Sequence, residues 1–146
     1  MKIRRANIAE TNELLQLTSY VMGESSMGYV PSDINIGYNV FSPLLNNGAY
    51  YLIAVKDHWI IGWVLIGPDF NPIHTEKTGS ILSIYVFPDY RNEGVGKQLM
   101  MRALKELQQH NYRKVHLNVY TGNPAKILYE KLGFHDVSTV MEMNLN

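Results

Sequence analysis

The chain has no cysteine, so it forms no disulfide, no thiolate metal site and no cysteine nucleophile. It also lacks an excess of either charge, because thirteen Lys and Arg residues balance thirteen Asp and Glu residues. A dedicated nucleic-acid binder would carry a basic excess, so that class is disfavoured. No apolar run approaches the roughly 18 residues of a membrane-spanning helix, and Met1 to Arg5 lack the apolar region of a signal peptide. We therefore expect a cytoplasmic protein without a membrane or nucleic-acid partner.

The length and composition predict a single domain covering residues 1–146, with enough apolar content to bury a proper core. Hydrophobic periodicity and turn residues give the expected elements. Strands are predicted at 2–5, 50–56, 59–66, 80–87, 115–120 and 136–144, and helices at 9–22, 36–45, 94–110 and 124–132. This order predicts an α/β fold with a mixed sheet of six to seven strands, flanked by about four helices.

One stretch, Ile81 to Lys97, reads as a buried strand, a proline-closed turn, a glycine-bearing loop and the first turn of a long helix. The N-terminus of a helix presents unpaired N–H groups and roughly half a positive charge, so it binds anions. Gly94 and Gly96 remove the side chains that would keep a bulky phosphate away from this backbone. The stretch therefore predicts an anion site.

Two common phosphate-binding patterns do not fit this loop. A P-loop needs a glycine five residues before Gly96 and a Ser or Thr after the lysine, but Arg91 and Gln98 occupy those positions. The dinucleotide-binding fingerprint needs a third glycine where Leu99 stands. The remaining pattern is Arg-x-x-Gly-x-Gly.

The pattern Val86-x-Pro88-x-Tyr90-Arg91-x-x-Gly94-x-Gly96, followed by an amphipathic helix, resembles the acetyl-CoA-binding motif of the GCN5-related N-acetyltransferase (GNAT) superfamily. A second block is similar to the C-terminal motif of that superfamily: Asn123, followed by Leu-Tyr-Glu-Lys-Leu-Gly-Phe at residues 128–134. The first motif alone is weakly specific, but the two together at this spacing are a strong signal. They cover about residues 80–134.

The resemblance implies a sheet that splays between strands 80–87 and 115–120, with acetyl-CoA bound in the gap and no metal. Asn123 would hydrogen-bond the cofactor arm, and Tyr129 would protonate the departing thiolate. The N–H of Val86 is the expected donor to the thioester carbonyl. Arg91, beside the anion loop, is expected either to contact a phosphate or to pair with a neighbouring acid. The other expected cofactor contacts are the main-chain groups of Ile84, Tyr85 and Val86, which would hold the pantetheine arm, and the backbone amides of Asn92, Glu93, Gly94, Val95, Gly96 and Lys97, which would hold the pyrophosphate.

The general base is not identified by the sequence. Many relatives carry a glutamate where Ser80 and Asn118 stand here, and neither of these is a base near neutral pH. His116, His74 and Glu76 are candidates, and a water relay to bulk solvent is an equally good alternative.

Structural readings compete with the functional ones for two residues. Asn123 before Pro124 is also a natural helix cap, and a tyrosine on an apolar helix such as Tyr129 is usually a packed core residue. We expect an acetyl-CoA-dependent N-acetyltransferase that acts by direct attack of a primary amine in a ternary complex, as a monomer or homodimer. The amine is expected on a small molecule or on a protein, as a lysine side chain or an N-terminus. The acceptor pocket is expected between residues 29–38, the loop 67–78 and the last strands. The alternative is a non-catalytic CoA-binding module.

Overall fold

The computed structural model describes residues 1–69 and 77–146. The N-terminal half contains three helices, and the C-terminal half has the longest helix. The elements are β1 (Lys2–Arg5), α1 (Ile8–Tyr20), α2 (Met22–Ser25), α3 (Ile34–Asn46), β2 (Tyr50–Lys56), β3 (Trp59–Pro68), β4 (Thr78–Val86), a 3₁₀ turn (Pro88–Tyr90), α4 (Val95–Gln109), β5 (Lys114–Leu117) and α5 (Ala125–Leu132).

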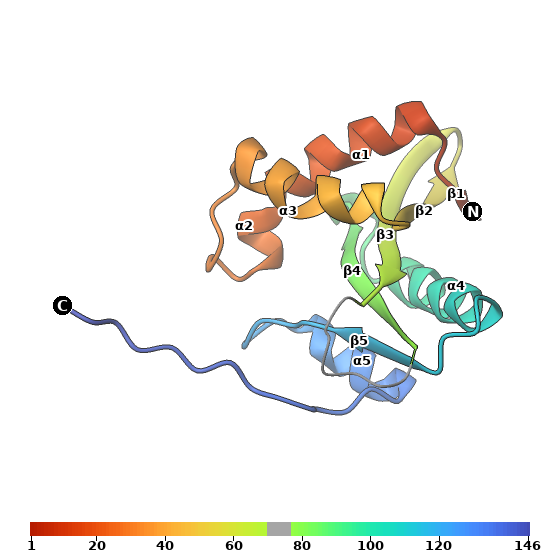
Figure 1. The fold of residues 1–146 in the computed structure, drawn as a ribbon. Helices are drawn as coiled ribbons and strands as arrows, with labels where there is room; N and C mark the ends of the chain where they lie inside the picture. The colour runs from red at the N-terminus through yellow and green to blue at the C-terminus, as the bar shows by residue number, and fades with distance from the viewer. Residues whose placement is uncertain (70–76) are drawn as a thin grey trace.

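The strands form one open sheet in the order β1-β2-β3-β4-β5. All neighbours are antiparallel except β4 and β5, which are parallel and joined through α4. Helices α1 and α3 cover one face of the sheet, which we call the α1/α3 face, and α4 covers the opposite face (Figure 1). This arrangement confirms the predicted α/β fold with a mixed sheet.

The central strands are buried on both faces, which explains their nearly continuous apolar sequence. Alternate residues point to opposite sides of a strand, so each central strand contributes side chains to two hydrophobic cores. Tyr51 and Trp63 pack towards α1 and α3, whereas Leu52 and Val64 pack towards α4. All four side chains are fully buried.

The gap between β4 and β5 has a simple geometric origin. The parallel ladder pairs residues 78–81 with 114–117 and ends at the Ile81–Leu117 pair, whereas β4 continues its pairing with β3 as far as Val86. A register shift between Leu65 and Ile66 bends the sheet just where β5 departs. The splay predicted for this position is therefore present, although β5 is shorter than the predicted strand at 115–120.

The described residues form five strands, slightly fewer than the six to seven predicted. The missing strand is the predicted one at 136–144, which is extended but not part of the sheet. Its alternating sequence favours a strand, but a strand forms only when its N–H and C=O groups meet a neighbouring strand. Within residues 1–69 and 77–146 there are five α-helices rather than about four, because the chain makes an additional short helix, α2.

Candidate active site

The main chain of β4 presents hydrogen-bonding groups to the gap. The N–H of Phe87 donates to the carbonyl of Ile61 at 3.0 Å. An antiparallel ladder alternates between paired and outward-facing residues, so Tyr85 pairs with β3 while Ile84 and Val86 point into the gap. Of the three predicted main-chain contacts, two therefore face the place where a cofactor arm would lie.

The loop after β4 ends in a row of backbone donors. Asn92 and Gly94 adopt left-handed conformations, with φ of 63° and 82°. Gly94 is the N-cap of α4 and supplies no side-chain acceptor. Among the described residues, none accepts a hydrogen bond from the backbone N–H groups of residues 92–97. The orphan donors of the helix end are thus available to an external anion.

Gly96 is not required by the fold. Its φ is not positive, and an added Cβ would meet only Val86 Cγ2 at 3.8 Å and Leu128 Cδ2 at 3.9 Å, which are ordinary contacts. A glycine inside a helix costs about 1 kcal/mol relative to alanine. A ligand that approaches this backbone closely would account for the glycine.

Arg91 ties the loop to the helical layer on the other side of β4. Its Nε donates to the carbonyl of Val86 at 2.8 Å, and its Nη2 lies 2.9 Å from Glu24 Oε1 of α2. Tyr85 donates its hydroxyl to the same carboxylate at 2.9 Å, and its ring lies 5.1 Å from the guanidinium carbon. The predicted pairing of Arg91 with an acid is present; its contact with a phosphate stays a prediction.

Tyr129 projects from α5 into the core beside the gap. The residue is 6% exposed, and its ring makes an edge contact with Phe134 at 6.2 Å. Burial raises the pKa of the Tyr129 phenol above its usual 10, so the phenol stays protonated at neutral pH. The hydroxyl donates to no described residue, and no fully buried side-chain oxygen in the described part of the chain lacks a partner. The oxygen therefore touches solvent while the ring is packed.

Asn123 caps α5, which confirms its predicted structural role as a helix cap. Its Oδ1 accepts a hydrogen bond from the N–H of Ala125 at 2.9 Å. The helix then ends at Gly133, which has a φ of 108°, so the predicted stop is confirmed. The cap uses only the oxygen of the amide, and the predicted contact of Asn123 with the cofactor arm would have to use its Nδ2.

His116 lies on the α1/α3 face beside Ser80. The two residues are register partners on β5 and β4. Gly79, the neighbour of Ser80, faces Leu107 and Tyr112 on the opposite side, so Ser80 and His116 face away from α4. His116 Nδ1 lies 3.1 Å from Asp69 Oδ2. The other two base candidates, His74 and Glu76, lie outside the described residues.

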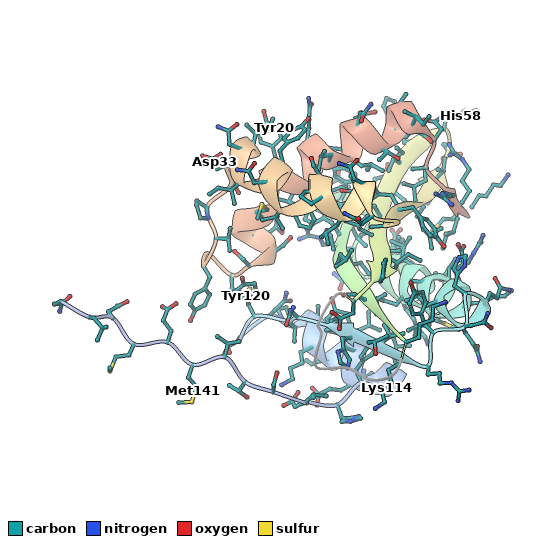
Figure 2. The ribbon with its side chains drawn as sticks, viewed as in Figure 1. Tyr20, Asp33, His58, Lys114, Tyr120 and Met141 are labelled. Atoms are coloured by element: carbon teal, nitrogen blue, oxygen red, sulfur yellow. The ribbon has the colours of Figure 1, made fainter. Side chains whose placement is uncertain are left out.

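Two aromatic rings frame the gap on the α1/α3 face. Tyr29, in the connection between α2 and α3, stacks on Tyr120 after β5, with 5.5 Å between ring centroids and 21° between planes. Figure 2 places Tyr120 below that connection, beyond the end of β5. The part of the chain predicted to line the acceptor pocket, at residues 29–38, thus contacts the segment that follows β5.

Two site residues were missed by sequence reasoning. Glu24 and Asp69 are 67 and 47 residues away from their partners Arg91 and His116. Neither occupies a motif or a periodic position, so no local signal could have found them.

The described residues contain no group of three His, Asp or Glu side chains that could hold a metal ion. None of the helices within residues 1–69 and 77–146 has the length and apolar content needed to span a bilayer.

Comparison with known proteins identifies the family. A sequence model of the acetyltransferase (GNAT) family matches residues 13–134. An N-alpha-acetyltransferase of Sulfurisphaera tokodaii is 25% identical, over 95% of this chain and 83% of that protein.

Solved structures agree in fold. A Pyrococcus furiosus protein assigned to the acetyl transferases superposes with a TM-score of 0.80 at 23% identity, over 99% of both chains. AAC(6')-Iy, in complex with the bisubstrate analogue CoA-S-monomethyl-acetylneamine, has a TM-score of 0.71 at 17% identity, over 99% of this chain and 97% of that one. The chain belongs to the acetyltransferase (GNAT) family and is an acetyl-CoA-dependent acyltransferase.

Proposed function

We propose that the protein transfers an acetyl group from acetyl-CoA directly to a primary amine, with both substrates bound at the gap between β4 and β5. The observation that carries this proposal is the convergence of three features on one gap. These are the free N–H groups of the loop at residues 92–97, the inward-facing main chain of Ile84 and Val86, and the buried phenol of Tyr129.

The gap has the donors that acetyl-CoA requires. The N–H groups of residues 92–97 would hold the pyrophosphate at the helix N-terminus. Ile84 and Val86 would pair with the amides of the extended arm as a neighbouring strand does. Asn123 would donate its Nδ2 to the same arm while its Oδ1 caps α5.

Acetyl-CoA supplies the activated acetyl thioester. Ile84 is a better candidate than Val86 for the N–H that polarises the carbonyl, because Val86 lies next to Gly96 at the phosphate end of the gap. Ile84 lies two residues before Val86 in β4 and is therefore further from the phosphate end of the gap. An extended cofactor arm would bring its thioester towards Ile84. Tyr129 holds its proton at Oη and donates it to the sulfur as the C–S bond breaks.

The attacking amine must lose a proton, and His116 is positioned to take it. His116 donates its Nδ1–H to Asp69, which fixes the tautomer in which Nε2 accepts a proton. It lies beside Ser80, where relatives carry glutamate, and on the face that Tyr29 and Tyr120 frame. We propose that His116 accepts the amine proton, directly or through one water.

Two acceptor classes are consistent with these features. The N-alpha-acetyltransferase relative favours the α-amino group of a peptide. The aromatic frame of Tyr29 and Tyr120 favours a small or aromatic amine. A panel of peptides, polyamines and aromatic amines, assayed by thiol release from acetyl-CoA, separates these classes.

The test of the mechanism is Tyr129→Phe, assayed with the best acceptor of the panel. Loss of the proton donor should lower kcat ten-fold or more while the affinity for acetyl-CoA stays nearly constant. Tyr112→Phe is the matched control, because Tyr112 lies on the α4 side near Gly79 and should keep full activity. An unchanged kcat in Tyr129→Phe would remove the phenol from the mechanism. Binding of acetyl-CoA without transfer to any amine would instead indicate a non-catalytic module.

The same assay tests His116. His116→Gln should lower kcat/KM and change its pH dependence, because glutamine cannot accept the amine proton, and should leave acetyl-CoA binding unchanged. His135→Gln, an exposed residue after α5, is the control. If both variants keep the wild-type pH profile, the proton leaves by another route.

A further inference from the structure

The carboxylate of Glu24, on the short helix α2, has both of its oxygens engaged. Its Oε1 lies 2.9 Å from Arg91 Nη2, and its Oε2 accepts a hydrogen bond from the Tyr85 hydroxyl at 2.9 Å. The ion pair is nevertheless open to water, because the Glu24 side chain is 54% exposed and that of Arg91 is 39% exposed. An ion pair between exposed groups is weak, since solvent screens it. Glu24 and Arg91 can therefore exchange each other for stronger partners.

Arg91 also occupies a main-chain group that the proposed cofactor site needs. Its Nε donates to the carbonyl of Val86 at 2.8 Å, and Val86 turns its main chain into the gap. Arg91 directly precedes the loop at residues 92–97, whose N–H groups are open to the pyrophosphate. A pyrophosphate carries more negative charge than a carboxylate, and arginine binds phosphate oxygens through paired hydrogen bonds. A pyrophosphate at this loop therefore competes with Glu24 and Val86 for the same guanidinium.

A Glu24 carboxylate released by Arg91 would stay on the α1/α3 face, where Tyr29 and Tyr120 frame the gap. Tyr85 packs on this face, with its ring stacked on Trp63 at 5.1 Å between centroids. Burial, and after it the hydrogen bond to Glu24, raise the pKa of Tyr85, so its hydroxyl remains a donor to the carboxylate. Glu24 thus lies about the length of a tyrosine side chain away from the main chain of β4, at which the thioester is proposed to lie.

This separation decides which part of an acceptor the carboxylate can bind. The reacting nitrogen must reach the thioester near Ile84 and must be uncharged to attack, so Glu24 does not hold that nitrogen during the reaction. A second, cationic group several bonds further along the acceptor fits the released carboxylate. The ring faces of Tyr29 and Tyr120, which are 61% and 40% exposed, also favour a cation.

We propose that Arg91 exchanges Glu24 for the pyrophosphate when acetyl-CoA binds, and that the released Glu24 then binds a second cationic group of the acceptor. Glu24 is thereby a specificity-determining residue that becomes available once the donor site is filled. The acceptor class is a primary amine with a second positive charge, which a linear diamine and a peptide with a basic side chain both supply. This role rests on the proposed function, because both substrates must meet at the gap.

Calorimetric titration with CoA tests the exchange without any acetyl transfer. Glu24→Gln removes the charge that competes for Arg91, so the dissociation constant for CoA should fall about two- to five-fold, the range expected for the loss of an exposed ion pair. Glu13→Gln, which is exposed on α1, is the matched control and should bind CoA like the wild type. Unchanged or weaker CoA binding in Glu24→Gln would overturn the exchange.

A second titration measures the acceptor role, with the diamine cadaverine as the probe and CoA in place of acetyl-CoA so that no product forms. The wild type saturated with CoA should bind cadaverine about ten-fold more tightly than the wild type without CoA, because only the first has a released carboxylate. Glu24→Gln should lose this difference, and Glu13→Gln should keep it. A cadaverine affinity that does not respond to CoA, or a response that persists in Glu24→Gln, would contradict the role of Glu24.

Turnover with matched acceptors tests the selection itself. With acetyl-CoA, the wild type should use cadaverine with a kcat/KM about ten-fold above that of pentylamine, which lacks the second amine. A peptide with lysine after its N-terminal residue, compared with the same peptide carrying norleucine there, shows whether a peptide supplies the second charge instead. Glu24→Gln should lower the value for the charged acceptor towards that of its uncharged match.

The outcomes separate this role from the proposed function. Equal kcat/KM values within both pairs of acceptors would overturn the selection while leaving acetyl transfer in place. Cadaverine binding that depends on CoA and on Glu24, without acetyl transfer to any amine, would instead support the role of Glu24 and overturn the proposed function.

Discussion

At the scale of one residue, Gly96 indicates a ligand site because the fold itself does not require a glycine at this position. Its backbone is ordinary and a Cβ would fit. A glycine at this position therefore lowers the stability of α4, and the packing around it does not explain the glycine. The same reasoning does not apply to Gly94, whose φ of 82° needs a residue that tolerates the left-handed region.

Gly96→Ala should therefore stabilise the protein and weaken its binding of acetyl-CoA. The free energy of unfolding should rise by about 0.5–1 kcal/mol, because alanine is the better helix former. The dissociation constant for acetyl-CoA should rise about ten-fold, equivalent to about 1.4 kcal/mol, because the methyl group blocks close approach to the backbone. Urea unfolding and calorimetric titration measure the two effects.

Gln98→Ala is the control for this substitution, because Gln98 is exposed in the same first turn. It should leave acetyl-CoA affinity unchanged. If Gly96→Ala binds acetyl-CoA as tightly as the wild type, the pyrophosphate does not lie against this residue.

At the scale of elements, the start of α1 is held by a cluster of hydrogen bonds. Asn7 and Glu10 form a capping box, and Arg4 of β1 pairs with both carboxylate oxygens of Glu10 at 2.8 and 2.9 Å. The hydrogen bonds from Arg4 and from the backbone of Asn7 lower the pKa of Glu10 from 4.5 to about 2. The cluster joins the first strand to the helix that covers one face of the sheet.

The lowered pKa of Glu10 predicts an acid-dependent contribution to stability. A carboxyl group whose pKa falls on folding stabilises the protein fully above pH 4.5 and loses this effect as the pH falls towards 2. Since both side chains are partly exposed, we expect a contribution of about 1 kcal/mol. Glu10→Gln should lower the free energy of unfolding by that amount at neutral pH and flatten its decline between pH 4.5 and 2.

Urea unfolding across this pH range measures the effect. Glu13→Gln, on the exposed side of the same helix, should follow the wild-type curve. An equal acid dependence in Glu10→Gln and wild type would assign the loss of stability to other carboxyl groups.

Another connection between elements bears on function. Glu24 links α2, which precedes the segment at 29–38 expected to line the acceptor pocket, to Arg91 in the loop proposed to hold the pyrophosphate. Tyr85 of β4 donates to the same carboxylate. The two halves of the proposed site therefore meet through one carboxylate on the shortest helix.

At the scale of the whole molecule, the two cores share one sheet. Strands β2 and β3 contribute side chains to both faces, so neither core can lose its strands without exposing the other. We therefore predict that residues 1–146 unfold as one cooperative domain.

A calorimetric scan should give a single unfolding transition, and acetyl-CoA should raise its Tm. At 100 times its dissociation constant, a ligand that binds only the folded state adds about 2.7 kcal/mol, which corresponds to about 5–10 °C in Tm for a chain of this size. Both scans use the same protein concentration, because the Tm of any oligomer depends on it. Two separate transitions, or a Tm insensitive to acetyl-CoA, would contradict the single domain or the donor site respectively.

Features that depend on neighbouring residues were determined by the sequence alone. The strand, loop and helix around Gly94, the cap at Asn123 and the stop at Gly133 follow from backbone preferences and hydrogen bonds that span a few residues. The family motif lies in these local features, so their backbone structure could be predicted in detail, whereas the contacts with acetyl-CoA stay predictions. The order of the main strands and helices was predicted for the same reason.

Only the tertiary structure decided which distant residues meet. The pairs Glu24–Arg91 and His116–Asp69 exist because α2 lies near Tyr85 of β4 and because β4 pairs with both β5 and the end of β3, and no local pattern encodes those contacts. The segment at 136–144 has the sequence of a strand but lies outside the sheet, because a strand requires a partner edge as well as a pattern. Local hydrogen bonds form between residues already close in the chain, whereas sheet membership and long-range ion pairs depend on how all the elements pack.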